Sequence, residues 1–67
     1  MNQSDVLIQK KDRMGWIILN RPEHKNMLNV SMIHHILEGL EKLDVDEDVR
    51  IIIIKGAWDD GFCAGMD

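Results

Sequence analysis

Hydrophobic and polar positions near the start of the chain predict a β-hairpin. Residues 6–10 and 16–19 are short stretches rich in β-prone side chains, and the polar segment 12–15 lies between them. This segment begins with Asp12 and ends with Gly15, two residue types that are frequent in tight turns. We therefore expect the two stretches to pair as antiparallel strands.

A helical pattern follows the hairpin. Pro22 ends the second strand because proline lacks an N–H donor, and the basic loop 24–26 comes next. Asn29 is a favourable N-cap residue, and apolar residues recur after it at helical spacing. The expected buried face consists of Met32, Ile33, Ile36, Leu37, Leu40 and Leu43. The expected exposed face carries His34, His35, Glu38, Glu41 and Lys42.

The last predicted strand is apolar on both faces. It covers residues 49–54, after the acidic connector 44–48. Strands of this kind are typically central and parallel, with helices covering at least one side. The order strand, strand, helix, strand predicts an α/β fold with a ββαβ unit and a right-handed crossover. Residues 56–61 then form a loop at the carboxyl end of the strand, where parallel sheets bind ligands.

Composition narrows the class of protein. Of 67 residues, 45% are hydrophobic and 30% are charged, with 8 Lys and Arg against 12 Asp and Glu and a net charge of −4. These values exclude a disordered chain, and the scattered positive charges argue against a nucleic-acid partner. The longest apolar run, residues 51–54, is far shorter than the roughly 20 residues that span a membrane.

Cysteine and histidine usage adds two expectations. A lone cysteine, Cys63, excludes an internal disulfide, and no grouping of Cys and His has the spacing of a zinc site. With no export signal at the N-terminus, a free thiol makes the cytoplasm the expected compartment.

The segment Ala64-Gly65-Met66 is the first candidate for chemistry. A glycine lets the backbone approach a ligand closely, so the N–H group of Met66 could face a developing oxyanion. By spacing alone, ordinary turn chemistry explains such a glycine more often.

Other polar residues fit solvated or structural roles better than catalytic ones. His34 and Glu38 could share a metal at i,i+4 spacing, yet a solvated helix face accounts for them more simply. Cys63 has no charged partner in the sequence and fits a buried structural cysteine better than a nucleophile. Asp59 and Asp60, adjacent in a loop, fit a pair of solvated carboxylates.

Three motifs together carry a family resemblance. Leu19-Asn20-Arg21-Pro22 is followed by Asn26-x-Leu28-Asn29, and the chain closes on Phe62-Cys63-Ala64-Gly65-x-Asp67. Their order and spacing resemble the opening of the crotonase family, also called the enoyl-CoA hydratase/isomerase superfamily. The resemblance covers residues 5–67. It implies that residues 1–67 are the N-terminal part of a crotonase-like domain, the opening ββαβ unit of a spiral fold and an incomplete domain.

The resemblance also implies a substrate and a site. Family members bind acyl-CoA or carrier-protein thioesters, commonly as trimers or hexamers. They need no cofactor beyond the CoA or phosphopantetheine of the substrate. The catalytic group implied here is the backbone N–H of Met66, one of two donors of an oxyanion hole, with the second donor and the catalytic carboxylates lying beyond residue 67. The implied substrate-binding residues are Glu23, His24, Lys25 and Met27 along the CoA chain, and Ala64, Gly65 and Asp67 beside the thioester.

Three functions follow as expectations. The first is an enoyl-CoA hydratase or isomerase that stabilises a thioester enolate, for which residues 1–67 alone would be inactive. The second rests on a narrower similarity of FCAGMD and LNVSMIHHIL to hydratase-like enzymes of polyketide β-branching, which dehydrate a carrier-protein-bound acyl group. The third is a non-catalytic truncated fragment or CoA-binding interaction module.

Overall fold

The N-terminal hairpin forms as the alternating pattern predicts. A computed structural model of the chain describes residues 5–66. Strands β1 (Val6–Lys11) and β2 (Met14–Leu19) pair antiparallel, with Ile8 opposite Ile17. The turn is shorter than predicted, because only Asp12 and Arg13 form it, with φ values of 53° and 67°. Two consecutive residues with positive φ match the twist of a two-residue hairpin, so residues 14 and 15 extend β2 instead.

Helix α1 (Val30–Asp44) begins where Asn29 predicts it. Asn29 Oδ1 accepts a hydrogen bond of 2.9 Å from the N–H group of Met32, which confirms the N-cap. The preceding loop contains a short 3₁₀ turn, η1 (Pro22–His24), in the segment predicted to be irregular. Within α1 the buried residues are Met32, Gly39 and Leu43.

The predicted buried face of α1 is too wide by one residue. Leu37 is 54% exposed, so its assignment to that face is wrong. At 3.6 residues per turn, Leu37 points about 140° around the helix from Met32, and a narrow sheet contacts only the stripe nearest Met32. Gly39 lies two turns after Met32 in the same stripe, and only a glycine there leaves room for Ile8 Cδ1.

Strand β3 (Ile51–Gly56) completes a three-stranded sheet of order β1-β2-β3. It pairs parallel with β2, placing Ile52 beside Gly15 and Ile54 beside Ile17. The α/β class, the ββαβ order and the parallel pairing are thus confirmed. Within residues 5–66 β2 is the middle strand, and β3 is an edge on which Ile51 is 56% exposed, so the expected central position of β3 stays a prediction for a larger sheet.

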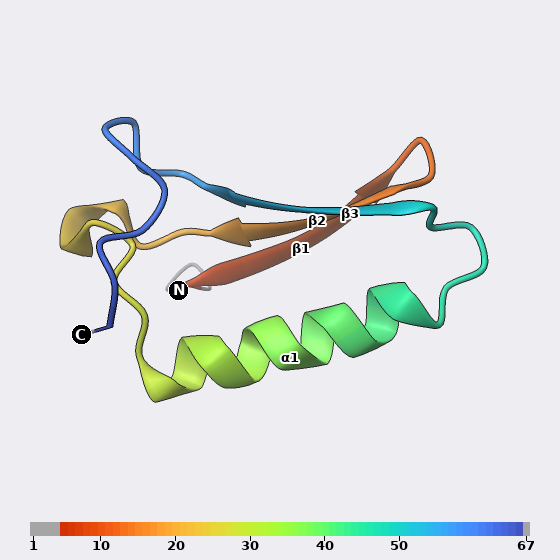
Figure 1. Ribbon diagram of the computed structural model, residues 1–67, viewed down its shortest axis with the longest axis horizontal. Helices are drawn as coiled ribbons and strands as arrows, with labels where there is room; N and C mark the ends of the chain where they lie inside the picture. The colour runs from red at the N-terminus through yellow and green to blue at the C-terminus, as the bar shows by residue number, and fades with distance from the viewer. Residues whose placement is uncertain (1–4, 67) are drawn as a thin grey trace, which may run out of the picture.

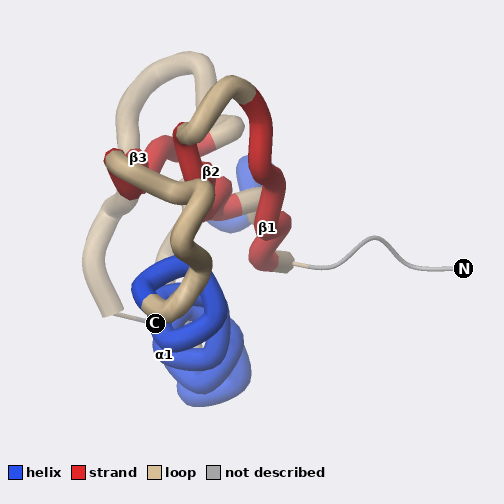
Figure 2. Tube along the Cα trace, turned by 90° about the vertical axis from the view of Figure 1, so that its right-hand side faces the viewer, coloured by secondary structure: helices blue, strands red, loops and turns tan. Residues whose placement is uncertain are grey.

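One layer of helix covers one face of the sheet (Figures 1 and 2). Between them lies a small apolar core made of Val6, Ile17, Leu19, Met32 and Leu43. No helix within residues 5–66 is long and apolar enough to cross a membrane. Because β2 and β3 run parallel, their carboxyl ends reach the same edge of the sheet, at the left of Figure 1.

At the opposite end, an ion pair ties the connector after α1 to β1. Lys10 Nζ lies 2.8 Å from a carboxylate oxygen of Asp46 and 3.6 Å from one of Asp48. The hydrogen bond from Lys10 holds the pKa of Asp46 below its ordinary value of 3.8, with a further contribution from the N–H of Asp48. The same hydrogen bond raises the pKa of Lys10 above 10.5.

We expect Met32→Ala to lower the free energy of unfolding by about 2–5 kcal/mol, because it leaves a cavity under the helix. Leu37→Ala, at an exposed position of the same helix, should cost less than about 1 kcal/mol. Urea unfolding followed by circular dichroism measures both. Equal losses would contradict the placement of Leu37 outside the core.

The Asp46 pair predicts a dependence of stability on pH. Since the folded-state pKa of Asp46 is lowered, its stabilisation is present above 3.8 and is lost as the pH falls through the folded value. The wild type should therefore exceed Asp46→Asn in stability at neutral pH and approach it in acid, with a smaller difference in high salt. Glu47→Gln makes the same charge change one residue away and is the control. A wild-type advantage that persists in strong acid would exclude this ion pair as its source.

Candidate functional site

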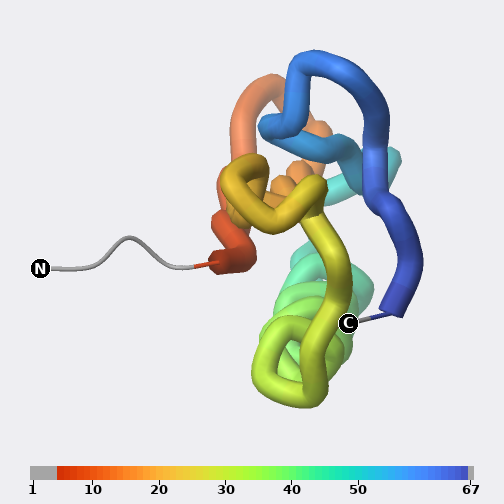
Figure 3. Tube along the Cα trace, turned by 90° about the vertical axis from the view of Figure 1, so that its left-hand side faces the viewer, coloured from red at the N-terminus to blue at the C-terminus, as the bar shows by residue number. Residues whose placement is uncertain are grey.

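Two loops meet at the carboxyl edge of the sheet, and they contain most of the residues predicted for a site. Residues 20–29 follow β2 and residues 57–66 follow β3, and Figure 3 shows them side by side in yellow and blue. The N–H of Ala64 donates to the carbonyl of Lys25 at 3.0 Å, and the N–H of Leu28 donates to the carbonyl of Gly65 at 2.8 Å. The final segment of the described chain therefore runs alongside residues 25–28.

Asn26 joins these loops from the inside. Its side chain is fully buried, at 0% exposure. Its Oδ1 accepts a hydrogen bond of 2.8 Å from the N–H of Arg21, and its Nδ2 donates one of 2.9 Å to the carbonyl of Phe62. Its own N–H donates to the carbonyl of Arg21 at 2.9 Å. We call these three hydrogen bonds the Asn26 clasp.

Gly56, at the end of β3, leaves space for the hydrogen bonds of the Asn26 clasp. A Cβ at Gly56 would lie 2.6 Å from the carbonyl oxygen of Phe62 and 2.7 Å from Asn26 Nδ2. Only glycine allows this approach. Any larger residue at position 56 would push the Asn26 amide and the carbonyl of Phe62 away from their present positions. Asn26 itself has φ of 55°, a left-handed conformation that asparagine tolerates better than most residues.

The Gly65–Met66 peptide has a defined direction. All described peptide bonds are trans, so the carbonyl of Gly65 and the N–H of Met66 point opposite ways. That carbonyl accepts from Leu28, which directs the Met66 N–H away from residues 20–29. The Met66 N–H donates to no acceptor within residues 5–66. Gly65 has φ of 112°, and its own N–H contacts Cys63 Sγ at 3.4 Å.

The predicted substrate-binding residues lie in the two loops that meet at this edge. Glu23 and His24 lie in η1 and are exposed, as are the side chain of Lys25 and the residues Ala64 and Gly65. Met27 is half-buried, and its carbonyl accepts a hydrogen bond of 2.9 Å from the guanidinium of Arg21. The remaining candidate, Asp67, lies outside the described residues.

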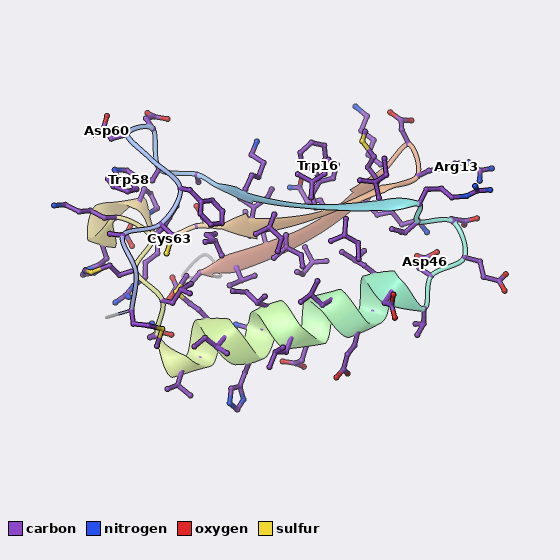
Figure 4. All side chains as sticks on the ribbon, viewed as in Figure 1. Arg13, Trp16, Asp46, Trp58, Asp60 and Cys63 are labelled. Atoms are coloured by element: carbon purple, nitrogen blue, oxygen red, sulfur yellow. The ribbon has the colours of Figure 1, made fainter. Side chains whose placement is uncertain are left out.

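The other candidates are exposed or have structural contacts, and Figure 4 shows Asp60 at the outer end of the loop after β3 and Cys63 closer to the sheet. His34 and His35 are exposed on α1, and Asp59 and Asp60 are exposed in the turn after β3. Cys63 is half-buried and packs against the core. Within the described part of the chain, no three His, Cys, Asp or Glu side chains are grouped closely enough to hold a metal ion.

Sequence reasoning missed Asn26 and Gly56 as residues that build the site. The sequence pattern places Asn26 in a basic loop and in the motif Asn26-x-Leu28-Asn29, and Gly56 at the start of the next loop, but it indicates no buried role for either. The available signals were a small polar residue between two longer side chains and a glycine directly after an apolar strand. Neither signal reveals burial, which depends on a partner 36 residues away in the chain.

Comparison with known proteins identifies the family. The family profile described as enoyl-CoA hydratase/isomerase matches residues 14–67, which is most of the chain. The chain belongs to the enoyl-CoA hydratase/isomerase family.

Particular relatives and structures agree with this assignment. Mitochondrial 3-hydroxyisobutyryl-CoA hydrolase of Danio rerio is 48% identical over 96% of this chain, and that of Homo sapiens is 46% identical over 94%. The crystal structure of enoyl-CoA hydratase from Mycobacterium tuberculosis H37Rv superimposes on 96% of the chain with a TM-score of 0.89 and 33% identity. Carnitinyl-CoA dehydratase from Mycobacterium thermoresistibile gives a TM-score of 0.91 over 97% of the chain, at 35% identity.

The chain is much shorter than these relatives. It spans 17% and 16% of the two hydrolases. It spans 28% of the hydratase structure and 19% of the dehydratase structure. The similarity therefore concerns the segment that contains the Asn26 clasp and the Gly65–Met66 peptide.

We expect Gly56→Ala to lower the free energy of unfolding by about 1–3 kcal/mol, because the new methyl group meets a backbone carbonyl and the buried amide. Gly61→Ala is the matched control, since a Cβ there would meet only the ring of Trp58, a side chain that can move. Thermal unfolding compares the two variants. A larger loss for Gly61→Ala would contradict the close approach of Gly56 to the clasp.

Proposed function

We propose that this chain forms the thioester-binding edge of an acyl-CoA enzyme, with the Met66 N–H as a donor to the thioester oxygen. The observation that carries the proposal is the direction of the Gly65–Met66 peptide. Its carbonyl is held by Leu28, which leaves the opposite N–H free of acceptors within residues 5–66. A donor that is oriented before the substrate arrives stabilises developing negative charge without reorganisation.

Hydrolysis is the reaction that we infer for the full-length protein. The 3-hydroxyisobutyryl-CoA hydrolases of seven vertebrates are 42–48% identical to this chain, whereas the solved hydratase and dehydratase structures named above are 33–35% identical. In hydrolysis, water attacks the thioester carbonyl, a tetrahedral oxyanion forms, and the CoA thiolate leaves with a proton. The Met66 N–H would stabilise that oxyanion. We infer a short 3-hydroxyacyl-CoA as the substrate class.

Hydration or isomerisation of an enoyl-CoA is the second candidate. It is favoured by the family profile over residues 14–67 and by the superposition on hydratases. Addition across the conjugated double bond places negative charge on the same thioester oxygen, as an enolate. One backbone donor would thus serve either reaction, and carboxylates outside this chain would choose between them.

The loop before α1 would bind the CoA part of the substrate. His24 and Lys25 are exposed next to the clasp, and an exposed ammonium group can pair with a nucleotide phosphate as a point charge. Glu23 and Met27 would lie along the same path, and Ala64 and Asp67 beside the thioester. A carrier-protein phosphopantetheine, as in polyketide β-branching, would use the same groove, and that narrower assignment remains a prediction. An assembly of trimers or hexamers and a cytoplasmic location likewise remain predictions.

Met66→Pro tests the donor directly, because proline has no N–H group. In the full-length protein we expect kcat to fall by about 10²–10³, the loss that follows removal of one oxyanion donor. Met66→Ala keeps the N–H and should lose far less. Thiol release from 3-hydroxyisobutyryl-CoA and hydration of a short enoyl-CoA are assayed in parallel, with circular dichroism to confirm folding.

The assays separate the candidate functions. Release of free thiol without hydration supports the hydrolase, and hydration alone supports the second candidate. Equal rates for Met66→Pro and Met66→Ala would exclude the Met66 N–H as the donor. No turnover of either substrate by the wild type would favour the non-catalytic alternative, a CoA-binding interaction module.

A further inference from the structure

We propose that Asn26 is a positioning residue that directs the Met66 N–H through the carbonyl of Phe62. This inference rests on the proposed function, because it concerns the donor that would face the thioester. Asn26 touches no part of the reacting group in the proposal. It acts on the segment that presents the donor, from the buried side.

Hydrogen bonds rather than apolar packing hold that segment. Phe62, Ala64, Gly65 and Met66 are all exposed, and apart from its chain neighbours no heavy atom lies within 4 Å of a Cβ built on Gly65. Only Cys63 is half-buried against the core. Apolar burial therefore contributes little to the position of residues 62–66. Their hydrogen bonds with residues 25–28 determine where they lie.

Three hydrogen bonds make those contacts. Two join backbone groups, from Ala64 to Lys25 and from Leu28 to Gly65. The third runs from Asn26 Nδ2 to the carbonyl of Phe62, at the start of the segment. It is the side-chain bond among the three, so the identity of residue 26 controls it.

The amide is suited to this position because it accepts and donates at once. Oδ1 is held by the N–H of Arg21, which fixes the plane of the amide and points Nδ2 at Phe62. An aspartate would keep the acceptor for Arg21 but, when ionised, has no proton to donate to the carbonyl. Loss of the donor would let Phe62, and the peptide four residues later, move relative to the substrate groove.

The expected signature is a loss of kcat with little change in KM. A displacement of about 1 Å at a reacting group can lower a rate by about 10². The CoA-binding loop, in contrast, keeps its own backbone bonds. In Asn26→Gly, which removes the amide and tolerates the left-handed φ of 55°, kcat should fall by about 10–100-fold while KM changes by less than about threefold.

A spectroscopic readout separates positioning from stability. A hydrogen bond to a thioester carbonyl polarises it and lowers its stretching frequency. We would record the infrared difference spectrum of a carbonyl-labelled, non-hydrolysable acyl-CoA analogue bound at saturation to the full-length protein. In the wild type the band should shift to lower frequency, and in Asn26→Gly it should move back toward the frequency of the free analogue.

Asn29→Ala is the matched control. Asn29 also accepts a backbone hydrogen bond, from Met32, but it caps α1 and makes no contact with residues 62–66 in the hydrogen bonds of the described chain. Loss of the Asn29 cap in Asn29→Ala should lower Tm, while the carbonyl band of the bound analogue stays at the wild-type frequency. Asn26→Asp serves as a second variant if Asn26→Gly does not fold.

Each outcome decides between the claims. A wild-type band that does not shift, together with no turnover, overturns the proposed function, and this inference with it. A shifted wild-type band that stays in place in folded Asn26→Gly or Asn26→Asp overturns the positioning role alone. Failure of both Asn26 variants to fold would give Asn26 a purely structural role and also overturn the proposal.

Discussion

A buried amide needs partners for both of its polar ends, and this requirement at Asn26 organises the loops at the carboxyl edge of the sheet. Removal of such a group from water without hydrogen bonds costs several kcal/mol by transfer measurements. The cost is avoided because Arg21 supplies a donor and Phe62 an acceptor, from segments on opposite sides of the clasp. The two loops therefore lie in one arrangement relative to each other, and Gly56 leaves room for it.

The ββαβ core brings these loops within reach of the amide. The crossover through α1 makes β2 and β3 parallel, so that the chain leaves both strands at one edge of the sheet. The core beneath that edge is small, with Met32 and Leu19 fully or almost fully buried. The N-cap at Asn29 starts helix α1 directly at the end of loop 20–29.

Under the proposed function, a backbone donor would explain how one framework serves several thioester reactions. Hydrolases, hydratases and a dehydratase appear among the proteins that resemble this chain. A tetrahedral oxyanion and an enolate both place charge on the thioester oxygen, so a peptide N–H oriented toward that oxygen favours both. The side chain of residue 66 is then free to differ without loss of the donor.

The sequence by itself determined the order of the elements, the N-cap, the parallel pairing of β3 and the family, because each is encoded in neighbouring residues or in a motif. It placed Leu37 in the core and extended the hairpin turn to Gly15, since periodicity says nothing about the width of the sheet or the φ values of a turn. Only the tertiary structure decided that Asn26 is buried and that the Met66 N–H points away from residues 20–29. Both depend on hydrogen bonds between segments about 36 residues apart, and these form only when the sheet brings distant loops together.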